Sequence, residues 1–291
     1  MNKPTLGLIA GCYVHSEGLP VSVFYIWLDR IMKLEKHEIG NMALFRCPKD
    51  PRTMSFPMGP IPLPQEPPLA RTLRSSVNEG HYVIYLHDKQ HNNFVPAWPQ
   101  LVPAQFKRRS RSPSQTCTPS PSGTPSRNTG TRIAVRMRDK CCLITGQAAV
   151  KRARGGNFTG LEVAHIYPLM GVGVPEWTAT LSASARAQVL TRQAADRPHN
   201  AMLLRADIHS LFDDYQWSIW SEQGIHKIVR FEKSGATVLE QYPTANLRPS
   251  SLNTTDPCNM ELLLAHLHVA LLIHVRGVGK RAVAGFNATL L

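Results

Sequence analysis

The sequence predicts an α+β protein, and three observations lead to this fold class. Runs of β-branched and aromatic residues bounded by glycine and proline, at 21–27 and 81–86, are typical of strands. Apolar residues between 208 and 215 recur at the spacing of one helical face. The apolar stretch 262–275 is shorter than the about 18 residues that a membrane-spanning helix needs. Helices and short strands are therefore expected around a hydrophobic core, with no membrane span.

Length and composition exclude several other classes. The chain has 291 residues, 43% of them hydrophobic, which is enough for one large or two small domains. It has no glycine period and no sustained heptad, and its six cysteines show no paired spacing. Reduced cysteines favour an intracellular protein. Residues 8–12 look like a lipoprotein cleavage box, but the apolar stretch before Cys12 is shorter than a signal sequence needs, so we expect a buried strand there.

Nearly all of the excess positive charge lies in one stretch of the chain. The formal net charge is +13; residues 101–160 hold twelve basic residues and one acidic residue, whereas 161–291 are balanced. Such a cluster attracts a polyanion by releasing counterions, or acts as a nuclear-import signal. The sequence therefore indicates a nucleic-acid partner or a nuclear address, with a solvated tail as the alternative.

Shifts in composition divide the chain into four expected segments: 1–102, 103–130, 131–225 and 226–291. The first is a small, mostly β region in which we find no chemical constellation. The second is rich in Ser, Pro and Arg, has almost nothing to bury, and is expected to be a disordered linker. The third is an ordered domain, and the fourth adds strands and a helix that pack on it.

The expected elements of the last two segments follow from local patterns. They are a short strand within 133–146 that closes in a turn at Gly146, a turn at Gly155-Gly156, an extended run at 161–167, an inserted helix within 177–195, an extended run at 200–204, a helix at 207–214, strands at 217–220 and 226–231, and a helix at 260–275. We expect His266, His268 and His274 to be partly exposed on that last helix.

Three polar residues are expected where a hairpin and the following helix converge: His165, Asn200 and His209. Asp213 lies four residues after His209 and therefore on the same helical face. An imidazole nitrogen and a carboxylate oxygen both suit Mg²⁺, Mn²⁺ or Zn²⁺. The pair predicts a site for one divalent metal ion. The structural alternatives are a strand-end histidine bonded to the backbone, a turn-capping asparagine, and a surface histidine and acid.

At these residues the sequence resembles the HNH endonuclease family, whose site is a ββα-metal motif of two strands and one helix. The resemblance rests on three segments in the family's order: DKCCLITG at 139–146, LEVAHIYP at 161–168 and NAMLLRADIHSLFD at 200–213. It is greatest to HNH domains that follow an unrelated N-terminal region in filamentous-fungal proteins, and it covers about 132–225. It implies a ββα-metal core with added helices, behind the mostly β region and the linker.

The resemblance also implies an activity, the metal-dependent hydrolysis of phosphodiester bonds that leaves 5′-phosphate and 3′-hydroxyl ends. It makes His165 the general base, because an imidazole takes up a proton near neutral pH. It makes His209 a metal ligand, and Asn200 the residue that holds either the loop or the His165 ring. The alternative function is a catalytically inactive module of the same fold that binds nucleic acid or protein.

The sequence departs from the commonest family pattern directly before His165. Many members place Asp or His there as a further ligand, and this chain has Ala164. We expect Asp213 to replace that ligand. Asp207 is the competitor, although its position also suits a helix N-cap. Glu162 is less expected, because its odd separation from His165 puts it on the other face of the strand.

The expected partner is duplex DNA, held through its phosphates rather than read by base sequence. The contacts are assigned to eight basic residues: Lys107, Arg108, Arg109, Arg136, Arg138, Lys151, Arg152 and Arg154. The expected location is intracellular, and nuclear if residues 107–111 act as an import patch. The sequence does not predict an oligomeric state.

Overall fold

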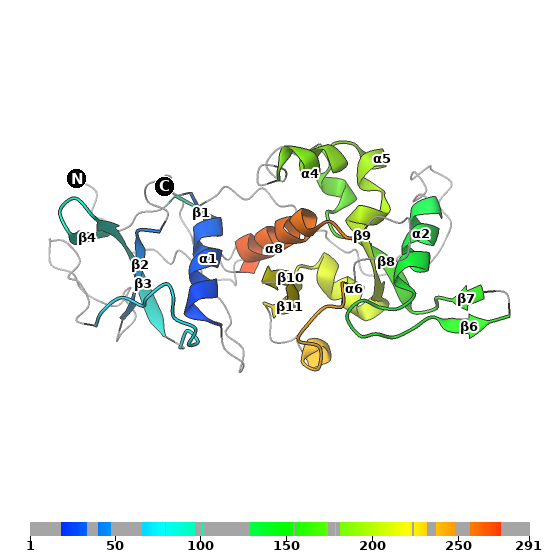
Figure 1. Cartoon of the computed structure of the whole chain (residues 1–291), viewed down its shortest axis with the longest axis horizontal. Helices are drawn as coiled ribbons and strands as arrows, with labels where there is room; N and C mark the ends of the chain where they lie inside the picture. The colour runs from blue at the N-terminus through cyan, green and yellow to red at the C-terminus, as the bar shows by residue number, and fades with distance from the viewer. Residues whose placement is uncertain are drawn as a thin grey trace, which may run out of the picture. The chain divides into compact units, whose positions relative to one another are not determined.

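The computed structural model of the chain describes residues 19–33, 40–47, 66–78, 80–96, 100–101, 129–153, 155–173, 178, 181–222, 224–231, 237–247 and 257–274. They form two compact units, one within residues 1–104 and one within 105–274. Both units combine helices with small antiparallel strand pairs, which confirms the α+β class (Figure 1). The strand expected at 8–12 lies outside the described residues. So does the linker expected at 103–130, except for its last two residues, which are helical.

The described part of the N-terminal unit contains one helix and two antiparallel sheets. Helix α1 spans Val21–Ile31, and the three-stranded sheet has the order β2 (Met42–Cys47), β3 (His81–Asp88) and β4 (Asn93–Pro96). A two-stranded pair joins β1 (Met32–Lys33) to β5 (Gln100–Leu101). Strand β3 confirms the extended run expected at 81–86.

The strand expected at 21–27 is wrong, because these residues belong to helix α1. The apolar run continues to Ile31, and Val21, Phe24, Leu28 and Ile31 are buried at helical spacing. One buried stripe is enough to stabilise a helix. The β preference of the branched and aromatic residues is weaker than the energy of burying that stripe.

The second unit contains the remaining elements. They are α2 (Thr129–Asp139), β6 (Val150–Arg152), β7 (Gly155–Asn157), β8 (Leu161–His165), η2 (Leu169–Gly171), α4 (Ala183–Gln188), α5 (Arg192–Ala195), η3 (Pro198–Asn200), β9 (Ala201–Arg205), α6 (Ala206–Asp213), β10 (Trp217–Glu222), β11 (Ile225–Arg230), η4 (Thr237–Leu239) and α8 (Met260–His274). The extended runs, the 207–214 helix and the later strands and helix are confirmed as β8, β9, α6, β10, β11 and α8.

Three local expectations in this unit are wrong. The first half of the segment 133–146, where a short strand was expected, is the end of helix α2, on which Thr131 and Val135 are buried four residues apart. The glycines at 155–156 form strand β7 rather than a turn. The single helix expected within 177–195 is two short helices, because Thr191 bonds the main-chain NH of Ala194 and so starts a second helix.

Strands β8 and β9 form the antiparallel pair on which the candidate site is built. His165 lies opposite Ala201, and Leu161 lies opposite Arg205. Helices α2 and α6 both pack against this pair (Figure 1). The core beneath it includes the fully buried Met202, Leu203 and other large side chains of β9 and α6. Strands β8 and β9 and helix α6 therefore pack together as one unit, in that order along the chain.

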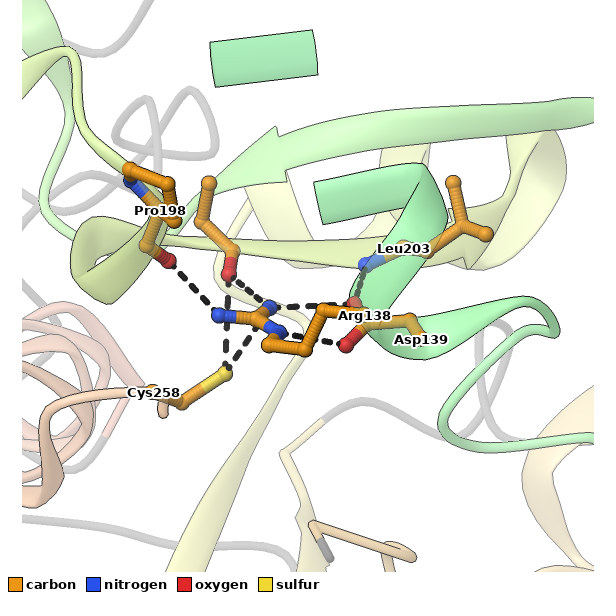
Figure 2. A network of polar contacts seen from close by, with 6 residues as sticks. Arg138, Asp139, Pro198, Leu203 and Cys258 are labelled. Atoms are coloured by element: carbon orange, nitrogen blue, oxygen red, sulfur yellow. Dashed lines mark hydrogen bonds and ion pairs between the residues drawn. The ribbon is translucent and has the colours of Figure 1, made fainter. Parts of the chain in front are cut away.

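A buried ion pair ties helix α2 to strand β9. The Arg138 and Asp139 side chains are each 4% exposed, and Arg138 Nε lies 2.6 Å from Asp139 Oδ1. The guanidinium also donates to the main-chain oxygens of Pro198 and Ala201, at 2.8 and 2.6 Å. Asp139 Oδ2 in turn accepts the NH of Leu203 at 2.8 Å (Figure 2). Each charge is thus compensated inside the fold, as a buried ion pair requires.

Helix α8 packs on strand β10 and is buried along most of its length. His266 and His268 are buried, so the expectation that they are partly exposed is wrong. Their polar rings do not mark a solvent face, because the helix is apolar on all sides and is therefore enclosed. In the part of the chain that the structure describes, no helix is both long and apolar enough to cross a bilayer.

Candidate functional site

Strand β8 carries two of the polar side chains and packs against helix α6. Glu162 and His165 lie three residues apart on this five-residue strand, so their Cα atoms are about 10 Å apart. The neighbouring α6 carries His209 and Asp213. Ala164, directly before His165, is fully buried. One strand and one helix thus present four side chains with nitrogen or oxygen atoms.

The His209 ring lies between two carboxylates. Its Nδ1 is 2.7 Å from Glu162 Oε2, and its Nε2 is 3.4 Å from Asp213 Oδ1. The ring is only 10% exposed. Burial by itself lowers the pKa of His209, but the bonds and charges of Asp213 and then of Glu162 outweigh burial and raise that pKa above its usual value.

Sequence reasoning considered Glu162 only as a less expected ligand and missed its bond to the Nδ1 of His209. Glu162 does lie on the strand face opposite His165, as the alternation of side chains requires. That face is the one against which α6 packs, and it is shared by the position of Ala164. The signal that could have identified Glu162 was therefore its even separation from residue 164, which puts both on one strand face. Position 164 is the one at which many members of the family that the sequence resembles hold a further ligand.

The donor set around His209 fits a divalent ion on one side of the ring. Glu162 accepts the Nδ1–H, which leaves a lone pair on Nε2 of the neutral ring, directed toward Asp213. Two electron-pair donors facing each other are stabilised by a cation between them, either a proton or a metal ion. Two atoms bound to one ion at about 2.1 Å lie about 3.0–3.4 Å apart, so the His209–Asp213 separation is suitable.

Among the described residues, the donors that face the position between His209 Nε2 and Asp213 are these two groups, since Glu162 lies on the other side of the ring. Within the described residues, no group of three or more His, Cys, Asp or Glu side chains is arranged to hold a metal ion. A carboxylate that accepts the other ring NH of a ligating histidine fixes its tautomer and orientation. The structure therefore favours Asp213 as a ligand candidate and Glu162 as the group that orients His209.

Asp207, the competing ligand candidate, is engaged elsewhere. Its two carboxylate oxygens accept bonds from Arg205 at 2.6 and 2.7 Å, and one of them also accepts the NH of Ile208. The bonds from Arg205 are the largest influence on the Asp207 carboxyl and lower its pKa. Asp207 therefore pairs with Arg205 inside the first turn of α6. It is not the N-cap that its position suggested, because the N-cap is Arg205 and no side chain caps the helix.

His165 is bonded to a residue that sequence reasoning missed. Its Nε2 lies 3.0 Å from Asp196 Oδ1, and the two side chains are 10% and 14% exposed. Asp196 directly follows helix α5, 31 positions along the chain from His165. Its only sequence signal is that it is the sole acidic residue between positions 177 and 206. Asp196 accordingly holds the side chain proposed as the base.

Asn200 is fully buried and bonds only main-chain groups among its described contacts. Its Oδ1 accepts the NH of Tyr167 at 2.7 Å, while its Nδ2 donates to the carbonyls of Tyr167 and Ala195, each at 2.9 Å. It thereby connects the chain after His165 with the chain before Asp196. Of its two expected roles, holding the loop and holding the ring, the contacts support the first.

The basic residues expected to contact DNA fall into three groups. Lys151 and Arg152 are exposed on β6, and Arg136 lies over the Phe158 ring at 4.8 Å. Arg138 is a correction: its side chain is buried in the ion pair described above, so it holds α2 to β9 and is not available to a phosphate. The others lie outside the described residues: Lys107, Arg108, Arg109 and Arg154.

Comparison with known proteins identifies a family for the central part of the chain. Residues 142–219 match a family model described as HNH endonuclease. This confirms the family resemblance over those residues, which include β8, β9, α6 and all four expected site residues. No curated protein and no solved structure matches the chain.

Proposed function

We propose that this chain is a metal-dependent endonuclease that hydrolyses phosphodiester bonds in nucleic acid, because residues 142–219 match the family model described as HNH endonuclease. The observation that carries the proposal is that both histidines of one strand–strand–helix unit are paired with carboxylates, one of which comes from the residue that follows α5. His165 is paired with Asp196, and His209 with Glu162 and Asp213. One pair suits proton transfer and the other suits a cation, and these are the two requirements of HNH chemistry. We interpret β8, β9 and α6 as the ββα-metal core.

In the proposed reaction His165 takes a proton from a water molecule. The water oxygen then bonds to phosphorus in line with the 3′ oxygen, the bond from phosphorus to that oxygen breaks, and the leaving oxygen gains a proton from solvent. The products are 5′-phosphate and 3′-hydroxyl ends. A bound divalent cation supplies positive charge that stabilises the phosphate oxygens and the leaving 3′ oxygen. Asn200 fixes the main chain that follows His165 and the main chain that precedes Asp196.

His209 Nε2 and Asp213 would hold the metal ion, and Glu162 would hold the ring. Catalytic zinc sites usually have three protein ligands, whereas Mg²⁺ usually keeps several waters and takes one or two carboxylates. A site with two facing protein donors therefore favours Mg²⁺ or Mn²⁺ over Zn²⁺. Glu162 leaves the remaining positions to water and substrate phosphate, because it faces the opposite ring nitrogen.

We propose duplex DNA as the substrate, held through its phosphates. Exposed Lys151 and Arg152 on the β6–β7 hairpin, together with Arg136, supply positive charge in this unit. The basic residues 107–111 would add a second phosphate contact and, as a nuclear-import patch, would place the enzyme with its substrate. Backbone contacts of this kind position a protein on DNA without reading its sequence.

The test is a supercoiled-plasmid nicking assay on the full chain with Mg²⁺ or Mn²⁺. We expect nicking that EDTA abolishes and that His165→Ala lowers by 100-fold or more, since a positioned general base contributes about 10²–10⁴-fold. His226→Ala is the matched control, because His226 lies on β11 of the same unit and its side chain bonds only Ser221 among its described hydrogen bonds. Equal cutting by wild type and His165→Ala would remove His165 as the base.

The second candidate function is a binding module that keeps this fold without catalysis. Two observations favour it: alanine at position 164, and the absence of a three-ligand group among the described residues. Such a module would bind plasmid DNA equally well with and without EDTA and would never nick it. Metal-dependent nicking therefore decides between the two functions.

A further inference from the structure

The bond between His165 and Asp196 determines which ring nitrogen can act as a base. An ionised carboxylate has no hydrogen to donate, so at Nε2 it accepts the ring N–H. A neutral imidazole with hydrogen on Nε2 has its lone pair on Nδ1. Both side chains are largely shielded from water, at 10% and 14% exposure, which strengthens the electrostatic attraction between them.

Asp196 is itself held by main-chain bonds from three directions. The Thr131 hydroxyl on α2 donates to the Asp196 carbonyl at 2.7 Å, and the Asp196 NH donates to the Arg192 carbonyl of α5 at 2.9 Å. Asn200 fixes the preceding carbonyl, that of Ala195, at 2.9 Å. The carboxylate is therefore carried on a rigid backbone. A change in the Asp196 side chain leaves these three main-chain bonds in place.

We propose that Asp196 is a positioning residue that keeps the proton on Nε2 of His165 and so makes Nδ1 the atom that deprotonates water. This inference rests on the proposed nuclease function. When Nδ1 accepts the water proton, the ring becomes an imidazolium, and the Asp196 carboxylate stabilises that charge without taking the proton itself. The water oxygen bonds to phosphorus as the 3′ oxygen leaves. The Asp196–His165 pair would thus perform the orienting task that a carboxylate performs for the histidine of a hydrolase triad.

The first test compares the kinetics of Asp196→Asn and Asp196→Glu in the full chain. The amide of Asn can donate its NH₂ to Nε2, which favours the opposite tautomer, so we expect kcat to fall by about 100-fold or more while KM changes little. Glu restores a carboxylate and should recover part of the lost rate. Thr131→Val, which removes one bond to the Asp196 carbonyl, should lower kcat by less than Asp196→Asn.

Asp29→Asn is the matched control for these kinetics. Asp29 is also a partly shielded acid, 22% exposed and paired with Arg71, but it lies in the N-terminal unit. Its loss removes an ion pair that is more exposed than the His165–Asp196 pair and that does not include His165, so kcat should be unchanged. If Asp196→Asn cut DNA as fast as Asp29→Asn, the positioning role would be refuted.

The second test reads the tautomer directly and requires no cleavage. Nitrogen-15 NMR of the histidine rings in the full chain, without metal or DNA and at a pH where the ring is neutral, distinguishes hydrogen on Nε2 from hydrogen on Nδ1. The His165 signals are assigned from their loss in His165→Ala. We expect hydrogen on Nε2 in the wild type and a shift toward Nδ1 in Asp196→Asn; the same tautomer in both would overturn the inference. A wild type that never cuts would refute the nuclease function and the catalytic role of Asp196, and NMR would report separately whether Asp196 sets the tautomer.

Discussion

Asp213 and Glu162 contact opposite nitrogens of the His209 ring and should therefore affect metal binding differently. Asp213 faces the nitrogen with the lone pair, so Asp213→Asn removes a direct ligand, and we expect Mn²⁺ binding to be lost or weakened by more than 100-fold. Glu162→Gln removes only the partner of the ring NH, and we expect affinity to fall by about 10-fold, the lower end of the range for such partners, because Glu162 is 54% exposed. Titration calorimetry with Mn²⁺ on the full chain measures both.

Asp207→Asn provides the matched control for these variants. Asp207 lies on the same helix and carries the same charge, but both of its oxygens already accept bonds from Arg205. We expect the affinity for Mn²⁺ to stay within about twofold of wild type. If Asp207→Asn weakened binding as much as Asp213→Asn, the ion would instead lie at the start of α6, and the assignment of His209 and Asp213 would be wrong.

The carboxylate partners were the part of the site that sequence could not supply. His209 and Asp213 are four residues apart on one helix, so their proximity follows from the helical repeat alone. His165 and Asp196 are 31 positions apart, and Glu162 and His209 are 47 positions apart. These contacts depend on how α5 and α6 pack against β8. No local pattern encodes that packing, and the family resemblance carried only the motif residues.

Helices α6 and α8 are joined through the ring of His266. This ring stacks on Phe212 with centroids 3.6 Å apart and planes at 5°, and it also stacks on Tyr215. Its Nε2 donates to the Phe212 carbonyl at 3.2 Å, and its Nδ1 accepts from the Ser218 hydroxyl at 2.9 Å. Both bonds require a neutral ring with hydrogen on Nε2. Burial lowers the pKa of His266 to about 3, although the bond to Phe212 and the charge of Asp213 act in the opposite direction.

This shift predicts that the protein loses stability in mild acid. Below pH of about 6.5 the unfolded chain binds a proton at His266, whereas the folded chain does so only near pH 3. The free energy of unfolding should therefore fall by up to about 1.4 kcal/mol per pH unit as the pH drops between these two values. Urea unfolding followed by circular dichroism, repeated at several pH values between 4 and 7, measures this slope.

The variant His266→Gln isolates this contribution from those of the other titrating groups. Glutamine is uncharged and can still donate and accept hydrogen bonds, but it does not titrate. We expect the variant to be less stable at pH 7, because the stacking on Phe212 is lost, and to have a shallower pH slope than the wild type. Parallel curves for the two proteins would show that His266 does not drive the acid sensitivity.

Local pattern predicted β8, β9 and α6 better than it predicted α1 or the burial of the histidines on α8. In β8, β9 and α6 the residue types, spacing and turns all point to the same structure, so the predictions agree with the fold. In α1 the β-branched residues favour a strand while the spacing from Val21 to Ile31 favours a helix, and burial decides. In α8 the histidines suggested a solvent-exposed face. The surroundings of His266, however, are set by Phe212 and Ser218, about 50 positions earlier in the sequence.

The excess positive charge of the whole chain is concentrated in residues 101–160, which lead into the region that matches the HNH family model. This distribution of charge predicts how DNA binding depends on salt. Replacing Lys107, Arg108, Arg109 and Arg111 with glutamine removes four charges while preserving the length of the segment. Each lost phosphate contact lowers the slope of log affinity against log salt by about 0.9, so the slope should decrease by up to about 3.6. Fluorescence anisotropy with a labelled duplex at several salt concentrations, without metal so that nothing is cut, measures the slope.

The double variant Lys151→Gln and Arg152→Gln tests the contribution of the folded domain in the same assay. Both residues are exposed on β6, and losing both should reduce the slope by up to about 1.8. Arg192→Gln is the control, an exposed basic residue on α5 that lies outside the charged stretch, and it should leave the slope unchanged. If all three proteins showed the wild-type slope, phosphate contact through residues 101–160 would be refuted. A reduction in the four-charge variant alone would place the contact in the segment before the domain, and a reduction in the hairpin variant alone would place it on β6.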